Sequence, residues 1–217
     1  MTTASLKERN DMTIKAVVFD IGNVLIEWHP ERFFDSVIGP ERRKAMFKAV
    51  DLHAMNDRVD MGAPFTQTIY DMADAHPEWR DEIRLWHDHW IEMAAPAIPH
   101  SERLMRALQA RGVPVFSLTN FGIGSYDLAA GHYPFLRAFD RDFISGHMGV
   151  IKPDPTIYHM LEAASGLSGA ELIFTDDRAD NIAAAHTRGW CTHLFEGPQG
   201  WADRLVAEGL LSAEEAQ

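Results

Sequence analysis

The chain has 217 residues, of which 46% are hydrophobic and 24% charged, a composition typical of a folded globular protein and not of a disordered or fibrous one. Acidic residues outnumber Lys and Arg by 32 to 20, and the resulting formal charge of −12 argues against nucleic acids or anionic membranes as partners. The only cysteine, Cys191, excludes a disulfide framework and predicts a reduced, cytoplasmic location. The polar segment 1–13 lacks the apolar stretch of a secretory signal and is predicted to be a tail.

The first predicted element is a buried strand at 15–19, where β-branched and aromatic residues follow one another. It stops at Asp20, and a polar turn with Gly22 comes next. From about 29 to 96 the sequence has no convincing strand and reads as several helices, the last at 79–94. Tryptophan and aliphatic residues recur in that helix at helical spacing. We interpret this stripe as the core of a helical subdomain, with the alternative that one tryptophan faces a ligand cleft.

Helices and strands alternate in the rest of the chain. Helices are predicted at 101–111, 154–164 and 180–188, and strands at 113–118, 172–175 and 190–195. This alternation predicts an α/β fold, a three-layer sandwich whose parallel, Rossmann-like sheet is covered by helices on both faces. We expect a core formed by 14–28 and 97–210, a helical cap at 29–96 inserted into it, and tails at 1–13 and 211–217.

Polar residues stand at the carboxyl ends of three predicted strands, and ligands of open parallel sheets bind at that edge. They are Asp20, Thr119, Asn120, Asp176 and Asp177, joined by Lys152 just before a predicted helix. Several carboxylates in one pocket repel one another unless a cation is present, and an all-oxygen site suits Mg²⁺. A lysine and a hydroxyl beside the metal can hold phosphoryl oxygens. The residues therefore indicate metal-assisted phosphoryl transfer in which Asp20 attacks phosphorus.

Four segments resemble, in order, the four motifs of the haloacid dehalogenase-like hydrolases. They are FDIGNVL at 19–25, LTN at 118–120, GVIKPDP at 149–155 and DDRADN at 176–181. The resemblance extends over about residues 14–196 and includes a helical cap between the first two motifs. It points to the branch with Asp-x-Gly-Asn in the first motif, which includes bacterial α-glucose-1-phosphate phosphatases. It implies a Mg²⁺-dependent phosphomonoesterase acting on a small phosphorylated metabolite, with a sugar phosphate as one hypothesis.

The resemblance also implies roles for individual residues. Asp20 would be the nucleophile that forms an aspartyl-phosphate. Asp20, the main-chain carbonyl of Gly22 and Asp177 would bind Mg²⁺. Asp176 would support Asp177 or replace it as a ligand. The implied phosphate contacts are Gly22, Thr119, Asn120 and Lys152.

Gly22 departs from the pattern of phosphatases in this family, which usually carry a second aspartate two residues after the nucleophile. That aspartate protonates the leaving group, a role typically worth about 10²–10⁴ in rate. Two explanations are compatible with activity. The substrate has a good leaving group, such as a sugar anomeric oxygen, or Glu27, His29 or a residue of the cap supplies the proton.

Three alternatives stay open. A 2-haloacid dehalogenase would use the same aspartate to attack carbon without a metal, although the adjacent Asp176 and Asp177 argue against a metal-free site. A receiver domain also combines these residue types, but its acidic pair opens the chain and its fold has no helical insertion. Gly22 also allows a catalytically weakened, phosphate-binding homologue. The sequence is compatible with a monomer or a homodimer.

Overall fold

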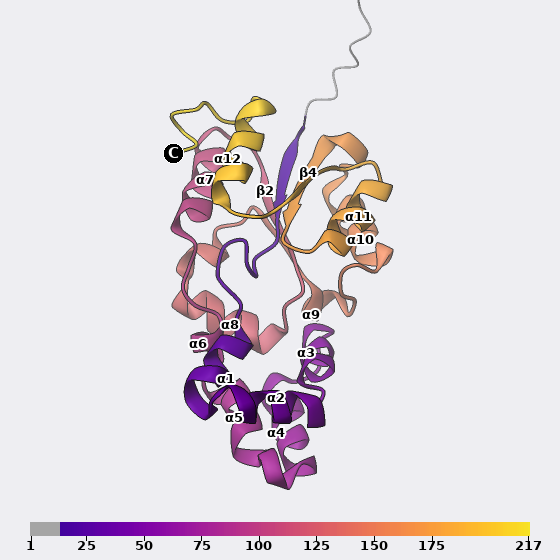
Figure 1. The fold of residues 1–217 in the computed structure, drawn as a ribbon. Coiled ribbons are helices and arrows are strands. Elements are labelled where there is room, and N and C mark those ends of the chain that lie inside the picture. Colours follow the sequence, from indigo (N-terminus) through magenta and orange to yellow (C-terminus); the bar gives the residue numbers. More distant parts are fainter. Residues whose placement is uncertain (1–13) are drawn as a thin grey trace, which may run out of the picture.

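A five-stranded parallel sheet forms the centre of the protein, whose residues 14–217 are described by a computed structural model (Figure 1). The strands are β1 (Ala16–Phe19), β2 (Val115–Thr119), β3 (Arg141–Ile144), β4 (Leu172–Asp176) and β5 (Cys191–Leu194). Their order across the sheet is β3-β2-β1-β4-β5, and every neighbouring pair is parallel. The predicted α/β fold with a parallel sheet is confirmed.

The sheet is the middle of three layers, because alternate strand residues face two separate apolar clusters. In β1, Val17 and Phe19 belong to one cluster and Ala16 and Val18 to the other, and all four are fully buried. Helices α7 (Pro99–Ala110) and α12 (Pro198–Ala207) cover the first face, and α10 (Pro155–Ser165) and α11 (Ala179–Thr187) cover the second (Figure 1). Burial on both faces explains why the three central strands, β1, β2 and β4, read as nearly continuous apolar runs.

Strand β3 was not predicted from the sequence. It lies at the edge of the sheet, and its first two residues, Arg141 and Asp142, are exposed. An edge strand that is half polar lacks the apolar run that marks the buried strands. In the chain it follows α8 (Ile123–His132) and the 3₁₀ turn η2 (Pro134–Arg137) and precedes the short α9 (Ser145–Met148). A further 3₁₀ turn, η3 (Gly169–Glu171), leads into β4 and contacts β5 at the other edge of the sheet.

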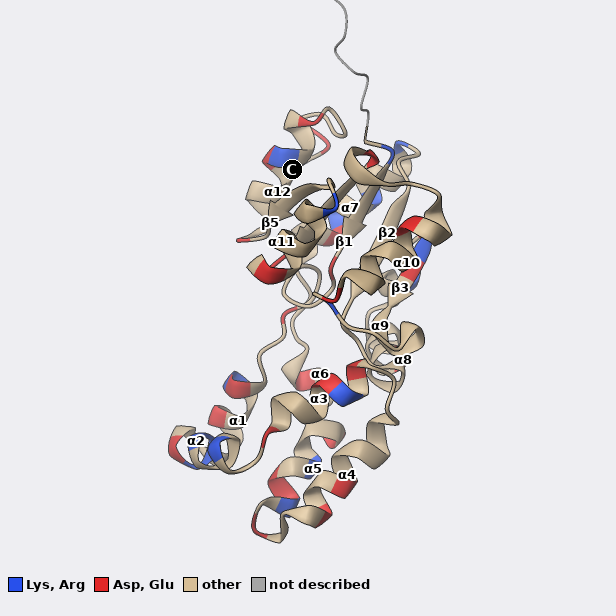
Figure 2. Cartoon of the chain, turned by 90° about the vertical axis from the view of Figure 1, so that its right-hand side faces the viewer, with Lys and Arg blue, Asp and Glu red and all other residues tan. Residues whose placement is uncertain are grey.

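The segment between β1 and α7 contains only helices, and we call residues 30–93 the helical insertion. Its helices are α1 (Pro30–Ile38), α2 (Pro40–Ala49), α3 (Leu52–Asp60), α4 (Phe65–Ala75), η1 (Pro77–Trp79), α5 (Arg80–Asp88) and α6 (Trp90–Met93). They lie beyond the carboxyl ends of the strands (Figure 1), and acidic and basic residues are interspersed along α3 and α5 (Figure 2). The predicted continuous helix at 79–94 is wrong, because His89 adopts non-helical angles (φ −120°, ψ 22°) between α5 and α6.

The insertion does not have an apolar core of its own. Its buried apolar residues, Val59 excepted, join the cluster on the α7 face of the sheet, and this shared cluster includes Ile83, Trp86, Trp90 and Met93 from the predicted stripe. Trp79 of the same stripe is only partly buried, and the Arg42 guanidinium lies over its ring at 4.8 Å. The prediction that the stripe is core is thus confirmed for all its residues but Trp79, although the core is shared with the sheet and does not belong to the insertion alone.

The last residues of the chain pack against α7. Residues 211–217 were expected to form a tail, but Ala216 is buried and its carbonyl accepts a hydrogen bond from His100 (2.8 Å). The other predicted tail, 1–13, lies outside the described residues. Within 14–217, every helix is too short or too polar to cross a membrane.

Candidate active site

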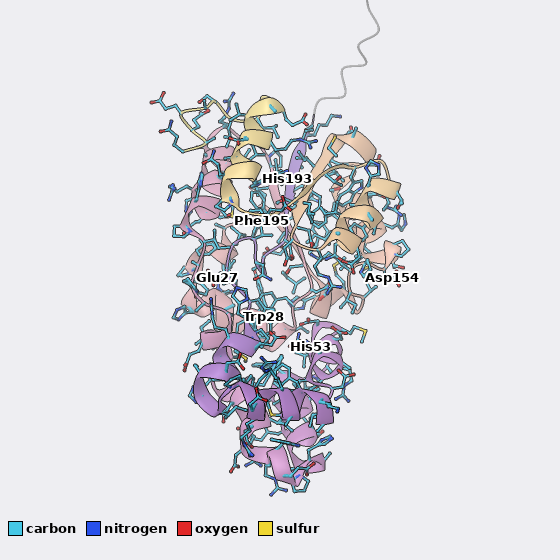
Figure 3. All side chains as sticks on the ribbon, viewed as in Figure 1. Glu27, Trp28, His53, Asp154, His193 and Phe195 are labelled. Atoms are coloured by element: carbon cyan, nitrogen blue, oxygen red, sulfur yellow. The ribbon has the colours of Figure 1, made fainter. Side chains whose placement is uncertain are left out.

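A cleft of about 290 Å³ lies where the sheet meets the helical insertion. The α/β part contributes Asp20, Thr119, Asn120, Lys152, Asp177 and Asn181 to its wall, and α3 and α5 contribute His53, Asn56, Asp57, Asp60 and Trp86. Figure 3 shows Trp28 and His53 at this boundary, with side chains of the sheet on one side and of the insertion on the other. The structure thus gathers residues that are up to about 160 positions apart in the sequence, because parallel strands end at one edge.

Lys152 is the buried cation of the site. Its ammonium lies 2.9 Å from Asp20 Oδ1 and 2.6 Å from Asp176 Oδ2, and it donates a hydrogen bond to the Leu118 carbonyl (2.8 Å). Burial by itself would lower the pKa of Lys152, but the charges of Asp176 and Asp20 outweigh burial and raise that pKa. Lys152 is therefore held as an ammonium between two carboxylates.

Asn120 fixes the position of Lys152. Its amide nitrogen donates to the Lys152 carbonyl (2.9 Å), and its amide oxygen accepts from the Lys152 N–H (2.7 Å). The following helix, α10, begins where the Asp154 side chain accepts from the Thr156 N–H (2.8 Å) and Pro155 occupies the first helical position. The Asn120 side chain, predicted as a phosphate contact, is thus already engaged in holding the lysine loop against the end of β2.

Asp20 has one carboxylate oxygen that remains available. The Ile21 N–H (2.8 Å) and the Lys152 ammonium both contact Oδ1, and no residue in 14–217 donates a hydrogen bond to Oδ2. Burial, partly offset by Lys152 and reinforced by Asp176 and Asp177, raises the pKa of Asp20 to about 7. A further cation beside this group would favour its ionised form.

Asp20, Asp176 and Asp177 form a cluster that could hold a metal ion, because one carboxylate oxygen of each lies within 4.8 Å of the others. Burial, together with the charge of Asp176, raises the pKa of Asp177 against the opposing hydrogen bond from Asn23. Three carboxylates beside one ammonium leave an excess of two negative charges when all are ionised. Oxygen ligands with this charge fit a divalent cation such as Mg²⁺.

The two adjacent aspartates have different surroundings. Asp176 is fully buried, and its oxygens accept from Lys152, from the Asn181 amide (3.0 Å to each) and from the Arg178 N–H (2.8 Å). Asp177 is half-buried and accepts from the Asn23 amide at 2.9 Å through Oδ2. Asp177 therefore has the freer carboxylate for a metal, whereas Asp176 is occupied in holding Lys152 and Asn181.

Two smaller features complete the phosphate side of the cleft. The Thr119 hydroxyl is buried and finds no hydrogen-bond partner within residues 14–217, so a ligand oxygen in the cleft would satisfy it. Gly22 lines the same cleft, and the nearest atom to a Cβ built there would be Trp28 Cβ at 4.0 Å. The position therefore has room for a side chain that this protein does not carry.

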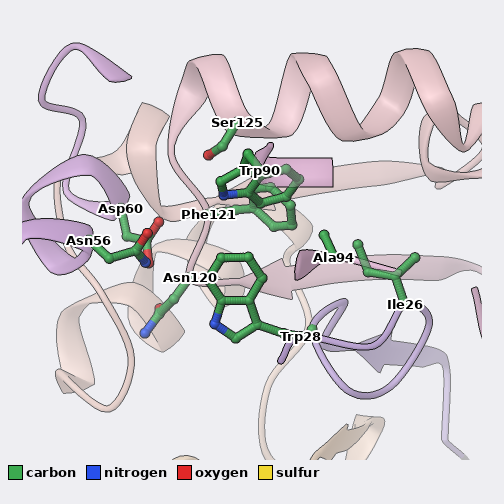
Figure 4. A pocket seen from close by; sticks show the side chains of 10 residues that line it. Ile26, Trp28, Asn56, Asp60, Trp90, Ala94, Asn120, Phe121 and Ser125 are labelled. Atoms are coloured by element: carbon green, nitrogen blue, oxygen red, sulfur yellow. The ribbon is translucent and has the colours of Figure 1, made fainter. Parts of the chain in front are cut away.

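A side pocket of about 80 Å³ opens beside Gly22 (Figure 4). One wall is aromatic, with Trp28 and Trp90 ring centroids 5.3 Å apart and Trp90 and Phe121 centroids 5.4 Å apart. The opposite rim is polar and contains Asn56, Asp60, Asn120 and Ser125. The alternative interpretation of the tryptophan stripe is also correct, because Trp86 lines the cleft and Trp90 lines the side pocket.

Several residues of the site were not singled out from the sequence. Asn23 and Asn181 lie inside the segments 19–25 and 176–181 that resemble family motifs, and this position could have identified them as site residues. Asn56 and Asp60 belong to the insertion, whose sequence carries no motif. Conversely, the two side chains suggested as proton donors, Glu27 and His29, line neither the cleft nor the side pocket, and Glu27 pairs with Arg32 at 2.7 Å.

The comparison with protein families matches the haloacid dehalogenase-like hydrolases over residues 14–187. Among curated proteins, the chain is similar to a sesquiterpene phosphatase of Aspergillus oryzae. The two are 26% identical over 190 residues, which cover 82% of this chain and 87% of the relative.

Solved structures share the fold. A HAD family enzyme from Bacteroides thetaiotaomicron superposes with a TM-score of 0.71 at 18% identity, over 89% of this chain and 98% of that one. Its complex with magnesium and inorganic phosphate gives a TM-score of 0.64 at 19% identity, over 83% and 93% of the two chains. The L-2-haloacid dehalogenase of Xanthobacter autotrophicus gives 0.60 at 18% identity, over 94% and 86%.

Proposed function

The chain belongs to the haloacid dehalogenase-like hydrolases, and within this family we propose that it is a Mg²⁺-dependent phosphomonoesterase for a small phosphorylated metabolite. The observation that carries the proposal is the cluster of Asp20, Asp176 and Asp177 around a single lysine. Its excess negative charge favours a phosphatase with a metal over a metal-free dehalogenase. The phosphatase relative and the neighbour that binds magnesium and phosphate support this choice.

Asp20, the main-chain carbonyl of Gly22 and Asp177 are the groups that would hold Mg²⁺. When bound, the ion supplies positive charge that lets one anion react with another and stabilises the phosphoryl oxygens. Asp176 would act indirectly, since its contacts with Lys152 and Asn181 keep the lysine in place. This division of roles follows from the freer carboxylate of Asp177.

The remaining chemistry is assigned to side chains of the cleft. Asp20 attacks phosphorus through Oδ2, the oxygen without a hydrogen bond from residues 14–217, and forms an aspartyl-phosphate. Lys152 and the Thr119 hydroxyl hold the phosphoryl oxygens during transfer. Water then hydrolyses the aspartyl-phosphate, and the helical insertion, acting as a cap, limits the access of bulk solvent.

Two classes of substrate have support. The Asp-x-Gly-Asn motif of the first segment resembles that of α-glucose-1-phosphate phosphatases, which favours a sugar phosphate. The aromatic wall of the side pocket favours a substrate with an apolar organic group, and the similarity to a sesquiterpene phosphatase supports an isoprenoid monophosphate. An apolar group would bury its surface against Trp28, Trp90 and Phe121, whereas a sugar would use the polar rim.

The test is a panel of sugar phosphates, isoprenoid monophosphates, nucleotides and phosphoserine, assayed with Mg²⁺ by phosphate release. We expect hydrolysis that stops when the metal is chelated and is absent from the Asp20→Asn variant, and the preferred ester identifies the substrate class. Metal-independent halide release from 2-chloropropionate would contradict the phosphatase. Phosphate binding without turnover of any ester would identify the weakened homologue instead.

A further inference from the structure

The cleft and the side pocket meet at one junction. The residues that line both are Gly22, Trp28, Asn56, Asp60 and Asn120. A substrate with its phosphate in the cleft and its organic group in the side pocket would place the bridging oxygen at this junction. Asp60 is the only titratable side chain among the five. We propose that Asp60 is the proton donor to the leaving group, an inference that rests on the proposed phosphatase function.

The position of Asp60 is well defined. It is the last residue of α3 and is 9% exposed, and its Oδ2 accepts a hydrogen bond from the Asn56 amide (2.9 Å). Asn56 is held in turn by the Trp86 indole N–H (3.3 Å). The Asp60 carbonyl accepts from the Ser145 hydroxyl (2.6 Å), which joins α3 to α9 of the α/β part. Figure 4 shows Asp60 and Asn56 together on the polar side of the pocket, facing the aromatic side chains.

Burial and, after it, the charge of Asp57 raise the pKa of Asp60 to about 7. The other groups that act on this carboxyl are the Gly122 N–H and Lys152, which lower its pKa, and Asp20, which raises it. Of the remaining titratable groups nearby, His53 lines the cleft and His147 on α9 is exposed. A carboxyl group that keeps its proton near neutral pH is suited to general acid catalysis.

Asp60 also stands where a donor is needed. Gly22 lines the same junction but carries no side chain, so the aspartate that family phosphatases have at that position is missing. Glu27 and His29 line neither pocket. The acid therefore comes from the insertion instead of from the loop after β1, and the nucleophile and the donor lie on two different parts of the fold.

The reaction balances with one proton that Asp60 gives and takes back. Asp20 forms a bond to phosphorus, the bond from phosphorus to the leaving oxygen breaks, and that oxygen takes the proton of Asp60. The resulting Asp60 carboxylate then accepts a proton from the water that attacks the aspartyl-phosphate. The bond from phosphorus to Asp20 breaks, and both aspartates return to their starting states. The net change is hydrolysis of one phosphate ester.

The first test compares two leaving groups in the Asp60→Asn variant, which keeps the shape of the side chain. With the best alkyl phosphate of the panel, we expect kcat/KM to fall by about 10²–10⁴, because the alkoxide leaves without a proton. With 4-nitrophenyl phosphate, nitrophenolate leaves without protonation, so the first turnover should slow by less than about tenfold. A burst followed by slow turnover should appear, because the same variant lacks the base for the second step.

The second test is the pH profile of kcat/KM. Since the protonated form of Asp60 is required, wild-type activity on the alkyl phosphate should decline as the pH rises through about 7. Asp57→Asn removes the neighbouring charge that raises the pKa of Asp60, so the decline should move to lower pH. Asp71→Asn changes the charge of the exposed face of α4 by the same amount and should leave the profile unchanged.

A double variant provides the third test. The open space at Gly22 accepts a side chain, so Gly22→Asp in the Asp60→Asn background should raise kcat/KM for the alkyl phosphate at least about tenfold and leave kcat/KM for 4-nitrophenyl phosphate nearly unchanged. Equal losses of kcat/KM in Asp60→Asn on both substrates, an equal regain of kcat/KM on both in the double variant, or an unmoved pH profile of Asp57→Asn would overturn the inference. So would a wild-type enzyme that hydrolyses only 4-nitrophenyl phosphate. A wild-type protein inactive on every phosphate would instead overturn the proposed function itself.

Discussion

At the scale of single residues, the site combines strong attraction with strong repulsion. Lys152 is 1% exposed, and its ammonium partly offsets the negative charges of Asp20 and Asp176. Asp177 adds a third carboxylate, with an oxygen within 4.8 Å of the other two. Burial raises the pKa of both Asp20 and Asp177, so their ionised forms are disfavoured in the protein without a cation. A divalent ion would relieve this repulsion, and its binding should therefore stabilise the folded state.

Magnesium should raise the thermal stability of the wild-type protein. At a free Mg²⁺ concentration about 100 times its Kd, linkage adds about 2.7 kcal/mol, which corresponds to a Tm increase of about 5–10 °C for a chain of this size. Asp177→Asn removes the freer carboxylate and should abolish most of this increase. Asp203→Asn, an equal change of charge on the exposed side of α12, should retain it. Thermal unfolding with and without Mg²⁺ measures the difference, and equal increases in both variants would contradict the assigned ligand.

At the scale of elements, the chemistry is carried by the loops after β1, β2 and β4 and by the loop before α10 that contains Lys152. Contacts between side chains of the neighbouring helices hold these loops in place. Glu162 on α10 accepts from the Arg188 guanidinium, including Nε at 3.0 Å, and from the Trp190 indole at 2.8 Å. Arg188 ends α11 and Trp190 precedes β5. One carboxylate thus joins α10 to the end of α11 and to the residue before β5.

Glu162→Gln should lower the free energy of unfolding by about 1–2 kcal/mol near neutral pH, because it breaks a charge-assisted contact. Burial acts against ionisation of Glu162, but Arg188 and Trp190 outweigh it and lower its pKa. The stabilisation is therefore present above the ordinary pKa of a glutamate and is lost as the pH falls through the lowered pKa. Urea unfolding at about pH 7 and about pH 3 should show that the difference in free energy of unfolding between variant and wild type is smaller in acid.

The exposed Glu78→Gln variant is the control for this change. It removes the same charge from η1 without touching Glu162, Arg188 or Trp190, and its free energy of unfolding should stay within about 0.5 kcal/mol of wild type. A Glu162→Gln variant whose stability matches that of Glu78→Gln would show that the three-element contact is not stabilising.

At the scale of the whole molecule, the helical insertion meets the α/β part along a seam where glycines permit close approach. A Cβ built at Gly122 would lie 2.4 Å from Val59 Cγ1, and one at Gly124 would lie 2.9 Å from Phe65 Cβ. A Cβ at Gly62, just after α3, would lie 2.7 Å from the Gly146 carbonyl oxygen of α9. These contacts determine how near α3, and with it Asp60, comes to the catalytic loops.

Gly122→Ala should displace α3 from the α/β part, because Val59 contacts the new methyl group through its backbone oxygen (2.9 Å) as well as its side chain. We expect a loss of stability of about 1–3 kcal/mol and a several-fold loss of kcat/KM. Gly131→Ala, inside helix α8 where an added Cβ would meet nothing within 4 Å, should instead stabilise by about 0.5–1 kcal/mol. Thermal unfolding and phosphatase assays of the pair test this, and similar behaviour of the two variants would count against a tight seam.

Much of the fold could be predicted from local sequence, and so could the site residues at the carboxyl ends of the strands. Strands β1, β2 and β4 are short apolar runs with polar residues after them, and this pattern depends only on neighbours in the chain. The rule that parallel strands end at one edge then brings Asp20, Thr119 and Asp176 together without knowledge of packing. Strand β3 was missed because an exposed edge strand has no such pattern.

The contribution of the helical insertion was decided by tertiary structure alone. Its sequence predicts helices and an apolar stripe, but Trp90 reaches the side pocket and Asp60 reaches the junction only because α3 and α6 dock on particular sides of the sheet edge. That docking depends on Gly122 and Gly124 at the start of α8 and on a hydrogen bond from Ser145, all distant in sequence from α3. Local periodicity determines which face of a helix is apolar, whereas long-range packing determines which of its polar residues meet the substrate.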